Sequence, residues 1–234
     1  MKWPRLRSPH AIVLFVACFT ASCANQQAGE DNVAWVGHSY QLSIASHQWS
    51  EPRGLGDDVG PYIPVFLIKV EGAGNELDVT ITTAAADGKQ DPCNKTIHVD
   101  ATAMYPALTI GPAEFKVRLI NDDPTDNKPG VEVYATAHDF TLTDVLPGGD
   151  GNGSLSATMD AREIYPLFTL LGDGATPDDL CAELADQTNN VATCQPCPTD
   201  DEPYCLTLKA ARVEATEFDG SIDDISKLGA SCTQ

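Results

Sequence analysis

Apolar and polar residues alternate one by one along several short segments of this sequence, and that alternation restricts the chain to a fold built from strands. Residues 40–44 and 77–82 have a period of two, whereas residues 65–70 form a continuous apolar run that is typical of a buried strand. Further strands are predicted at residues 96–101, 115–119, 131–137, 140–145, 155–159 and 205–215. Asp-Gly, Pro-Gly and Gly-Gly pairs lie between them. The pattern predicts a mainly β protein, an antiparallel meander that forms a sandwich or a barrel.

Two short helices are expected to interrupt the strands. Thr176 is a capping residue and Pro177 suits the first helical position, and because acidic residues follow in the first turn, a helix should extend to about Asp186. A second, shorter helix is predicted to begin at Ser221 and to end at Gly229.

The N-terminus has the anatomy of a secretory signal peptide. Lys2, Arg5 and Arg7 precede an apolar run at residues 11–21. This run is shorter than the roughly 18 apolar residues that a membrane-spanning helix needs. We therefore expect residues 1–22 to direct export and then to be removed.

The apolar run ends in Thr20-Ala21-Ser22-Cys23, which resembles the lipobox of bacterial lipoproteins. In that family small residues precede a cysteine that receives fatty acyl chains such as palmitate and becomes the new N-terminus, although the family usually has Leu where Thr20 stands. The resemblance implies lipidation of Cys23. Because Ala24 rather than Asp follows, it also implies anchoring in the outer membrane of the cell envelope. The alternative is ordinary cleavage after Ala21 or Ser22, which would leave Cys23 as a thiol or a disulfide partner.

After the anchor, residues 23–34 are expected to form a polar tether that leads into a single β-rich domain at residues 35–234. The last part of this domain, residues 176–234, is rich in cysteine.

Two segments of the domain resemble each other, residues 100–110 and 160–170. The similarity suggests that a strand-turn-strand unit is duplicated at residues 76–110 and 132–170. In each copy a Tyr-Pro pair should end a strand. We interpret Tyr105 and Tyr165 as structural corner residues, with a role in lining a ligand cavity as the alternative.

The chain is strongly acidic, with a formal net charge of −20, and loss of Lys2, Arg5 and Arg7 makes it three units more negative. Such a surface repels phosphate, so nucleic acid is not expected as a partner. It also repels anionic lipid surfaces, so attachment to a membrane would depend on the acyl chains alone. The simplest role of the acidity is solubility.

Six cysteines remain once Cys18 in the leader and Cys23 are set aside: Cys93, Cys181, Cys194, Cys197, Cys205 and Cys232. Export places them in an oxidising compartment, so three disulfides are expected, in a pairing that the sequence alone does not fix. We expect residues 181–205 to form a cross-linked loop that fastens the helix to the last long strand, and Cys93 to pair with Cys232.

Two other interpretations of these cysteines are open. Cys194-Gln195-Pro196-Cys197 resembles the redox motif of thioredoxin-like oxidoreductases, but the acidic segment that follows is typical of a loop rather than of the helix which that motif begins. The spacing of the four cysteines from 181 to 205 also permits a zinc site, which the oxidising compartment disfavours.

Calcium is the remaining cofactor candidate. Asp150 and Asn152 resemble the start of a calcium-binding loop, but Ala161 stands where that motif needs an acidic residue. Asp122 and Asp126 belong to a second oxygen-rich loop. Turn formation is the simpler interpretation of both stretches, so no cofactor is assigned.

The common motifs of nucleophilic, phosphate-binding and metalloprotease sites are absent from the sequence, and no catalytic residue is named. The favoured hypothesis is a non-enzymatic envelope lipoprotein whose β-domain has a structural or binding role, with a partner protein or an apolar ligand. The alternative is an envelope enzyme, hydrolytic or thiol-redox, whose site is assembled from residues far apart in the chain.

Overall fold

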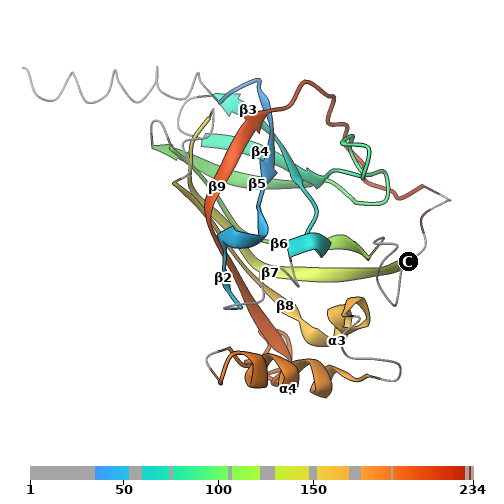
Figure 1. The fold of residues 1–234 in the computed structure, drawn as a ribbon. Coiled ribbons are helices and arrows are strands. Elements are labelled where there is room, and N and C mark those ends of the chain that lie inside the picture. The colour runs from blue at the N-terminus through green and yellow to red at the C-terminus, as the bar shows by residue number, and fades with distance from the viewer. Residues whose placement is uncertain are drawn as a thin grey trace, which may run out of the picture.

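One antiparallel sheet of nine strands makes up most of the molecule (Figure 1). The structure, a computed structural model, describes residues 35–52, 60–73, 76–104, 107–121, 130–147, 152–168, 175–190, 192–229 and 232. The strands are β1 Ser39–Ser43, β2 Trp49–Glu51, β3 Phe66–Ala73, β4 Glu76–Thr83, β5 Ile97–Met104, β6 Ala107–Asn121, β7 Val131–Val145, β8 Gly153–Asp160 and β9 Cys205–Glu217. The fold class predicted from the sequence is confirmed.

The short strand β1 closes the sheet. On one side Tyr40 and Leu42 are in register with Ile68 and Phe66 of β3, and on the other side β1 pairs with residues 214–217 of β9. Every strand from β3 to β9 pairs with the next one along the chain, so the meander becomes a closed barrel. The three-residue strand β2 pairs with β9 farther along, at Lys209 and Ala210.

The interior of the barrel is filled. Alternate residues of β6 and β8 are buried, and their side chains join one apolar cluster that draws on all the strands of the closed ring. At its centre Phe66, Phe115 and Phe140 pack with ring centroids 5.1–6.2 Å apart. Tilted and edge-to-face aromatic pairs of this kind add to the stabilisation from burial alone.

Each predicted strand is present, but two of them join to form one continuous strand. Residues 131–137 and 140–145 form the single 15-residue strand β7, with a register shift against β8 between His138 and Thr141. Asp139 takes a positive φ of 51° at that point. A bulge changes which residues face inward, so the period-two pattern breaks there while the strand goes on.

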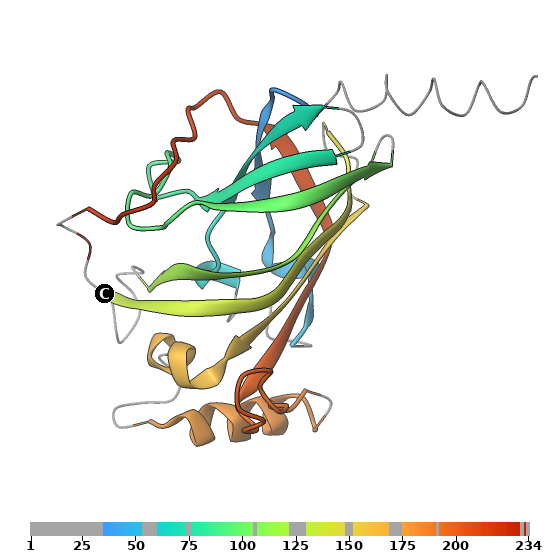
Figure 2. The same cartoon turned by 180° about the vertical axis from the view of Figure 1, so that it is seen from behind.

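The wall of the barrel opens between β5 and β6. The two strands pair only from Ala101–Met104 to Ala107–Ile110 and then diverge, as Figure 2 shows. The pairing ends at Gly111, which has a φ of 94°, and three register shifts against β7 lie between Leu108 and Phe115. Past this point β6 bends away from β5 and continues with β7.

Two short α-helices lie at one end of the barrel, opposite the end at which β1 begins (Figure 1). The predicted helix at Thr176 is confirmed as α4, Pro177–Gln187, with a capping box between Thr176 and Asp179. The other helix is α3, Ala161–Ile164, capped by Asp160 and followed by a 3-10 turn at Tyr165–Leu167.

The helix predicted from Ser221 is wrong. Residues 221–229 form no helix, because their backbone is engaged by the loop before β5. Gln90 exchanges two hydrogen bonds with the backbone of Asp223, and Thr96 does the same with Ile225. These tertiary contacts outweigh the weak helical preference of a short segment.

The two similar segments fold differently. Residues 101–104 of the first copy belong to β5, whereas residues 161–164 of the second copy form α3. Tyr165 lies in a 3-10 turn after α3, so the prediction that it ends a strand is wrong. Tyr105 lies outside the described residues. The likeness in sequence does not extend to local structure.

Gly111→Ala should destabilise the barrel more than Gly88→Ala. Both glycines have a positive φ, which costs an alanine roughly 1–2 kcal/mol. A methyl group at Gly111 would also collide with the carbonyl oxygen of Phe140, whereas nothing lies within 4 Å of the corresponding position at Gly88. Overpacking adds about 1–3 kcal/mol. Urea unfolding of both variants measures the difference, and equal losses would contradict this account of the bend in β6.

Candidate functional site

A groove occupies the opening in the barrel wall where β5 and β6 diverge. Its volume is about 760 Å³, within the range of roughly 300–1,000 Å³ that small-molecule sites have. Its lining comes from the start of β5 and the loop before it, from β6 and β7, and from the C-terminal segment, residues 218–229. We call this the wall groove, lined by Cys93, Asn94, Lys95, Thr96, Ile97, Phe115, Lys116, Glu132, Val133, Tyr134 and Leu228.

The loop before β5 takes the place of a neighbouring strand beside β6. The backbone N–H of Arg118 donates to Asn94 Oδ1 at 2.8 Å, so a side chain meets a donor on the edge that β5 has left. Asn94 in turn donates to Asp91 Oδ2 at 3.1 Å and to the Thr83 hydroxyl. Asn94 and Asp91 are both buried. The loop is therefore fixed by hydrogen bonds and forms the base of the opening.

Arg118 joins this loop to the β6–β7 hairpin. Its guanidinium donates to Asp91 Oδ2 at 3.2 Å and to Glu132 Oε2 at 2.7 Å. The hydrogen bond to Glu132 is the main cause of a raised Arg118 pKa, so the group stays cationic. Burial, with the negative charge of Glu132, raises the pKa of Tyr134, which stays a neutral phenol at the groove.

The C-terminal segment forms the far side of the wall groove. It is held to the loop before β5 by the Gln90 and Thr96 contacts, by a hydrogen bond of 2.6 Å from the Thr96 hydroxyl to Asp224, and by the Cys93–Cys232 disulfide. Figure 2 shows the two segments side by side. This arrangement places half-buried Leu228 at the groove, opposite the strands.

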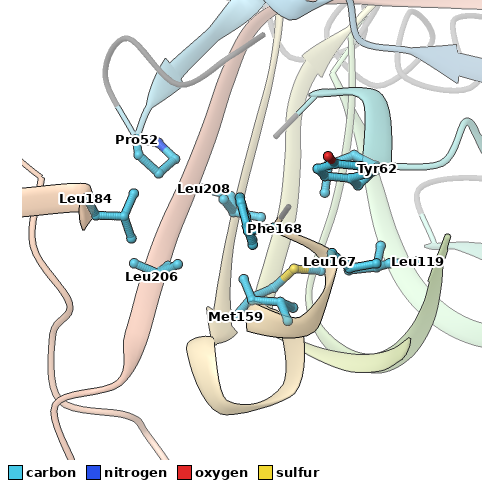
Figure 3. A pocket seen from close by; sticks show the side chains of 11 residues that line it. Pro52, Tyr62, Leu119, Met159, Leu167, Phe168, Leu184, Leu206 and Leu208 are labelled. Carbon is cyan, nitrogen blue, oxygen red and sulfur yellow. The ribbon is translucent and has the colours of Figure 1, made fainter. Parts of the chain in front are cut away.

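A second cavity, between the end of the barrel and the helices, is too small for an organic ligand (Figure 3). About 20 Å³ of space remains inside it, and its lining is wholly apolar. Leu184 of α4 approaches Leu206 and Leu208 of β9, and Phe168 packs edge-on against Tyr62 at 5.9 Å. We interpret this space as a packing seam that seats α4.

All six candidate cysteines form disulfides, and the expected Cys93–Cys232 bond is present. Cys181 pairs with Cys194, and Cys197 pairs with Cys205. These two bonds fasten α4 to the start of β9 through the loop between them, as the sequence suggested. Cys194 and Cys197 are not bonded to each other, so the thiol-redox motif is not formed. The four sulfurs that a zinc site would need are bonded in pairs.

One close group of candidate metal ligands occurs among the described residues, Asp160 with Cys197 and Cys205. Its two sulfurs are bonded to each other, and Arg162 Nε donates to both carboxylate oxygens of Asp160 at 2.9 Å. An ion would have to displace these partners, so we assign no metal to it.

Several residues singled out in the sequence lie outside the described part of the chain. These are Cys23, Asp122, Asp126 and Asp150, so lipidation and calcium binding stay predictions. Asn152 is described and exposed, just before β8.

Three of the histidines of the domain pair with different carboxylates. His38 pairs with Glu217 and His138 with Glu114, whereas His98 lies near Asp78 and Asp224. These contacts sit at separate places on the barrel, so the histidines provide no shared site.

Sequence reasoning missed the wall groove because its residues belong to no motif. One available signal was Gly111-Pro112 inside a predicted run of strands. Glycine and proline in a strand interior mark a bulge or a place where strand pairing ends. The signal locates the departure of β6 from β5, but not which side chains gather there.

None of the described helices is long and apolar enough to cross a bilayer. The chain matches no family model, no curated protein and no solved structure.

Arg118→Met should lower the free energy of unfolding by about 3 kcal/mol, because it leaves the buried Asp91 carboxylate without its cation. The double variant with Asp91→Asn should recover part of this loss. Arg162→Met removes a cation that also bridges two carboxylates but is more exposed, and should cost much less. Denaturant unfolding compares the variants. Equal effects at Arg118 and Arg162 would show that the loop before β5 does not depend on this cluster.

Proposed function

We propose that this chain is a lipid-anchored protein of the bacterial cell envelope, held in the outer membrane through Cys23, whose β-barrel is a non-enzymatic binding module with the wall groove as its binding site. The observation that carries the binding role is the contrast between a filled barrel and an open wall. Among the described residues, aromatic and aliphatic side chains pack the interior into one apolar cluster, whereas the wall groove offers about 760 Å³.

The composition of the wall groove supports a binding role. Ile97, Phe115 and Val133 supply apolar surface, while the exposed Lys95 and Lys116 supply charged groups. Ligand sites combine apolar surface with polar groups that fix the orientation of the ligand, and the wall groove offers both. Two fixed elements hold these side chains in place, the Arg118 cluster and the Cys93–Cys232 disulfide. The site is therefore preorganised, which reduces the entropy lost on binding.

The anchor half of the proposal rests on the lipobox-like Thr20-Ala21-Ser22-Cys23 and on the charge of the domain. A tether from Cys23 to Trp35 reaches up to roughly 40 Å when extended. That length lets the barrel stand clear of a membrane surface whose anionic lipids it repels. An acidic domain on a lipid-anchored tether would stay near the membrane without lying against it.

Cys23→Ser should release the folded domain from the membrane fraction. The substitution removes the sulfur that would carry the acyl chains, and the acidic surface provides no second attachment. Fractionation of cells that produce the full chain measures the change, with Cys18→Ser as the matched control because Cys18 lies in the leader. Continued membrane association of the Cys23→Ser chain would contradict the anchor.

Leu228→Trp tests the groove separately from the anchor. Leu228 lies on the C-terminal segment and not on a barrel strand, so a larger side chain there should fill the wall groove and leave the barrel intact. Native mass spectrometry of both proteins, each incubated with the same small-molecule extract of cell envelopes, should show an adduct on the wild type that is lost from the variant. Identical adducts on both would rule out the groove as the binding site.

A further inference from the structure

The positive charges at the wall groove are unusual for this molecule. The described lysines elsewhere are paired: Lys69 with Glu71 at 2.7 Å, Lys89 with Asp87 at 3.3 Å and Lys209 with Glu51 at 3.0 Å. Lys95 and Lys116 have no carboxylate within ion-pairing distance among the described residues, and both line the wall groove. Lys227, next to Leu228, is likewise without one. In a chain with a net charge of −20, Lys95 and Lys116 bring to one groove two cations that have no ion pair among the described residues. Arg212 on β9 is another such cation, but it lies away from the groove.

The acidic side chains near the groove make contacts with groups other than Lys95 and Lys116. Glu132 accepts a hydrogen bond from the Arg118 guanidinium at 2.7 Å. Asp224 accepts one from the Thr96 hydroxyl at 2.6 Å and keeps its negative charge. Asp91 is buried beneath the loop with Arg118 and Asn94. Lys95 and Lys116 are exposed and remain available to an incoming anion.

The apolar part of the lining lies beside these lysines. Phe115 is buried, and Ile97, Val133 and Leu228 are partly buried, so a ligand that covers them removes further apolar surface from water. A ligand that satisfies both parts of the lining must be amphipathic, with an apolar body against the strands and an anionic group at the lysines.

We infer that the wall groove binds an amphiphile with one anionic head group, of the fatty-acid or lipid-phosphate class, with Lys95 and Lys116 holding the head group and Phe115, Val133 and Leu228 contacting the apolar part. This inference rests on the proposed use of the groove as the binding site and adds the class of ligand. The long-range field of the domain repels anions, so the lysines must act at contact distance, where screening by salt is weakest.

The test uses dansyl-labelled undecanoic acid as the probe and its methyl ester as the neutral counterpart. Fluorescence titration is carried out on the mature chain with Cys23→Ser, so that no lipid of the protein competes. The acid should bind in a saturable way and the ester at least about tenfold more weakly. Lys95→Gln with Lys116→Gln should weaken binding of the acid by about tenfold or more, since two charge-assisted contacts are lost.

The matched control is Lys69→Gln with Lys209→Gln, which removes the same charge away from the groove and should leave binding of the acid unchanged. Leu228→Trp should weaken both probes. A dansyl-labelled undecyl phosphate, if it binds more tightly than the acid, assigns the head group to the phosphate class, and the reverse order assigns it to the carboxylate class.

Three results would overturn the inference. If the ester binds as well as the acid and the groove lysine variant behaves as wild type, the groove is a neutral apolar site, and the proposed function survives without this ligand class. If the groove variant (Lys95, Lys116) and the control variant (Lys69, Lys209) weaken binding of the acid equally, binding depends on the net charge of the protein and not on the groove lysines. If the wild type binds neither probe, the anionic class is excluded, while the envelope-extract experiment still decides separately whether the groove binds a ligand.

Discussion

Pairing of β1 with both β3 and β9 is the constraint on which the rest of the structure depends. It turns a meander with two open edges into a ring, and a ring removes the exposed strand edges that promote aggregation. A small ring also fixes how much interior there is, and here Phe66, Phe115 and Phe140 take up its centre. The centre is occupied by these side chains, and the wall groove lies where strand pairing in the ring is interrupted, at the gap between β5 and β6.

Side chains of the loop before β5 replace part of the strand pairing that β6 loses, and they give the groove its polar base. Where β6 leaves β5, Asn94 supplies the acceptor that a strand would have supplied, and Arg118 fixes the loop that carries Asn94. These groups are polar and largely buried, so they must be matched closely or they would destabilise the fold. The groove therefore has a rigid polar base beneath an apolar wall. The combination arises because backbone groups of β6 need hydrogen-bond partners where β5 departs, and no recognisable sequence motif accounts for it.

The sequence predicted the strands because burial on one face produces a period of two that survives in almost every strand. It predicted α4 because Thr176, Pro177 and Asp179 form a local signal that needs no distant partner. It failed at residues 221–229, where Gln90 and Thr96 determine the conformation from more than a hundred positions away. It likewise gave no hint that Lys95 and Lys116 share a groove, since their proximity depends on where β6 bends.

The Cys93–Cys232 bond has a consequence for how the chain is made. It joins the loop before β5 to nearly the last residue, across a separation of 139 positions, and β1 cannot be sealed until β9 is present. During synthesis from the N-terminus, β1 is therefore made before the strand β9 with which it pairs. The groove is completed only after β9, because Leu228 on its far side follows that strand in the chain. A chain cut short near its end would keep most of its strands and lose this surface.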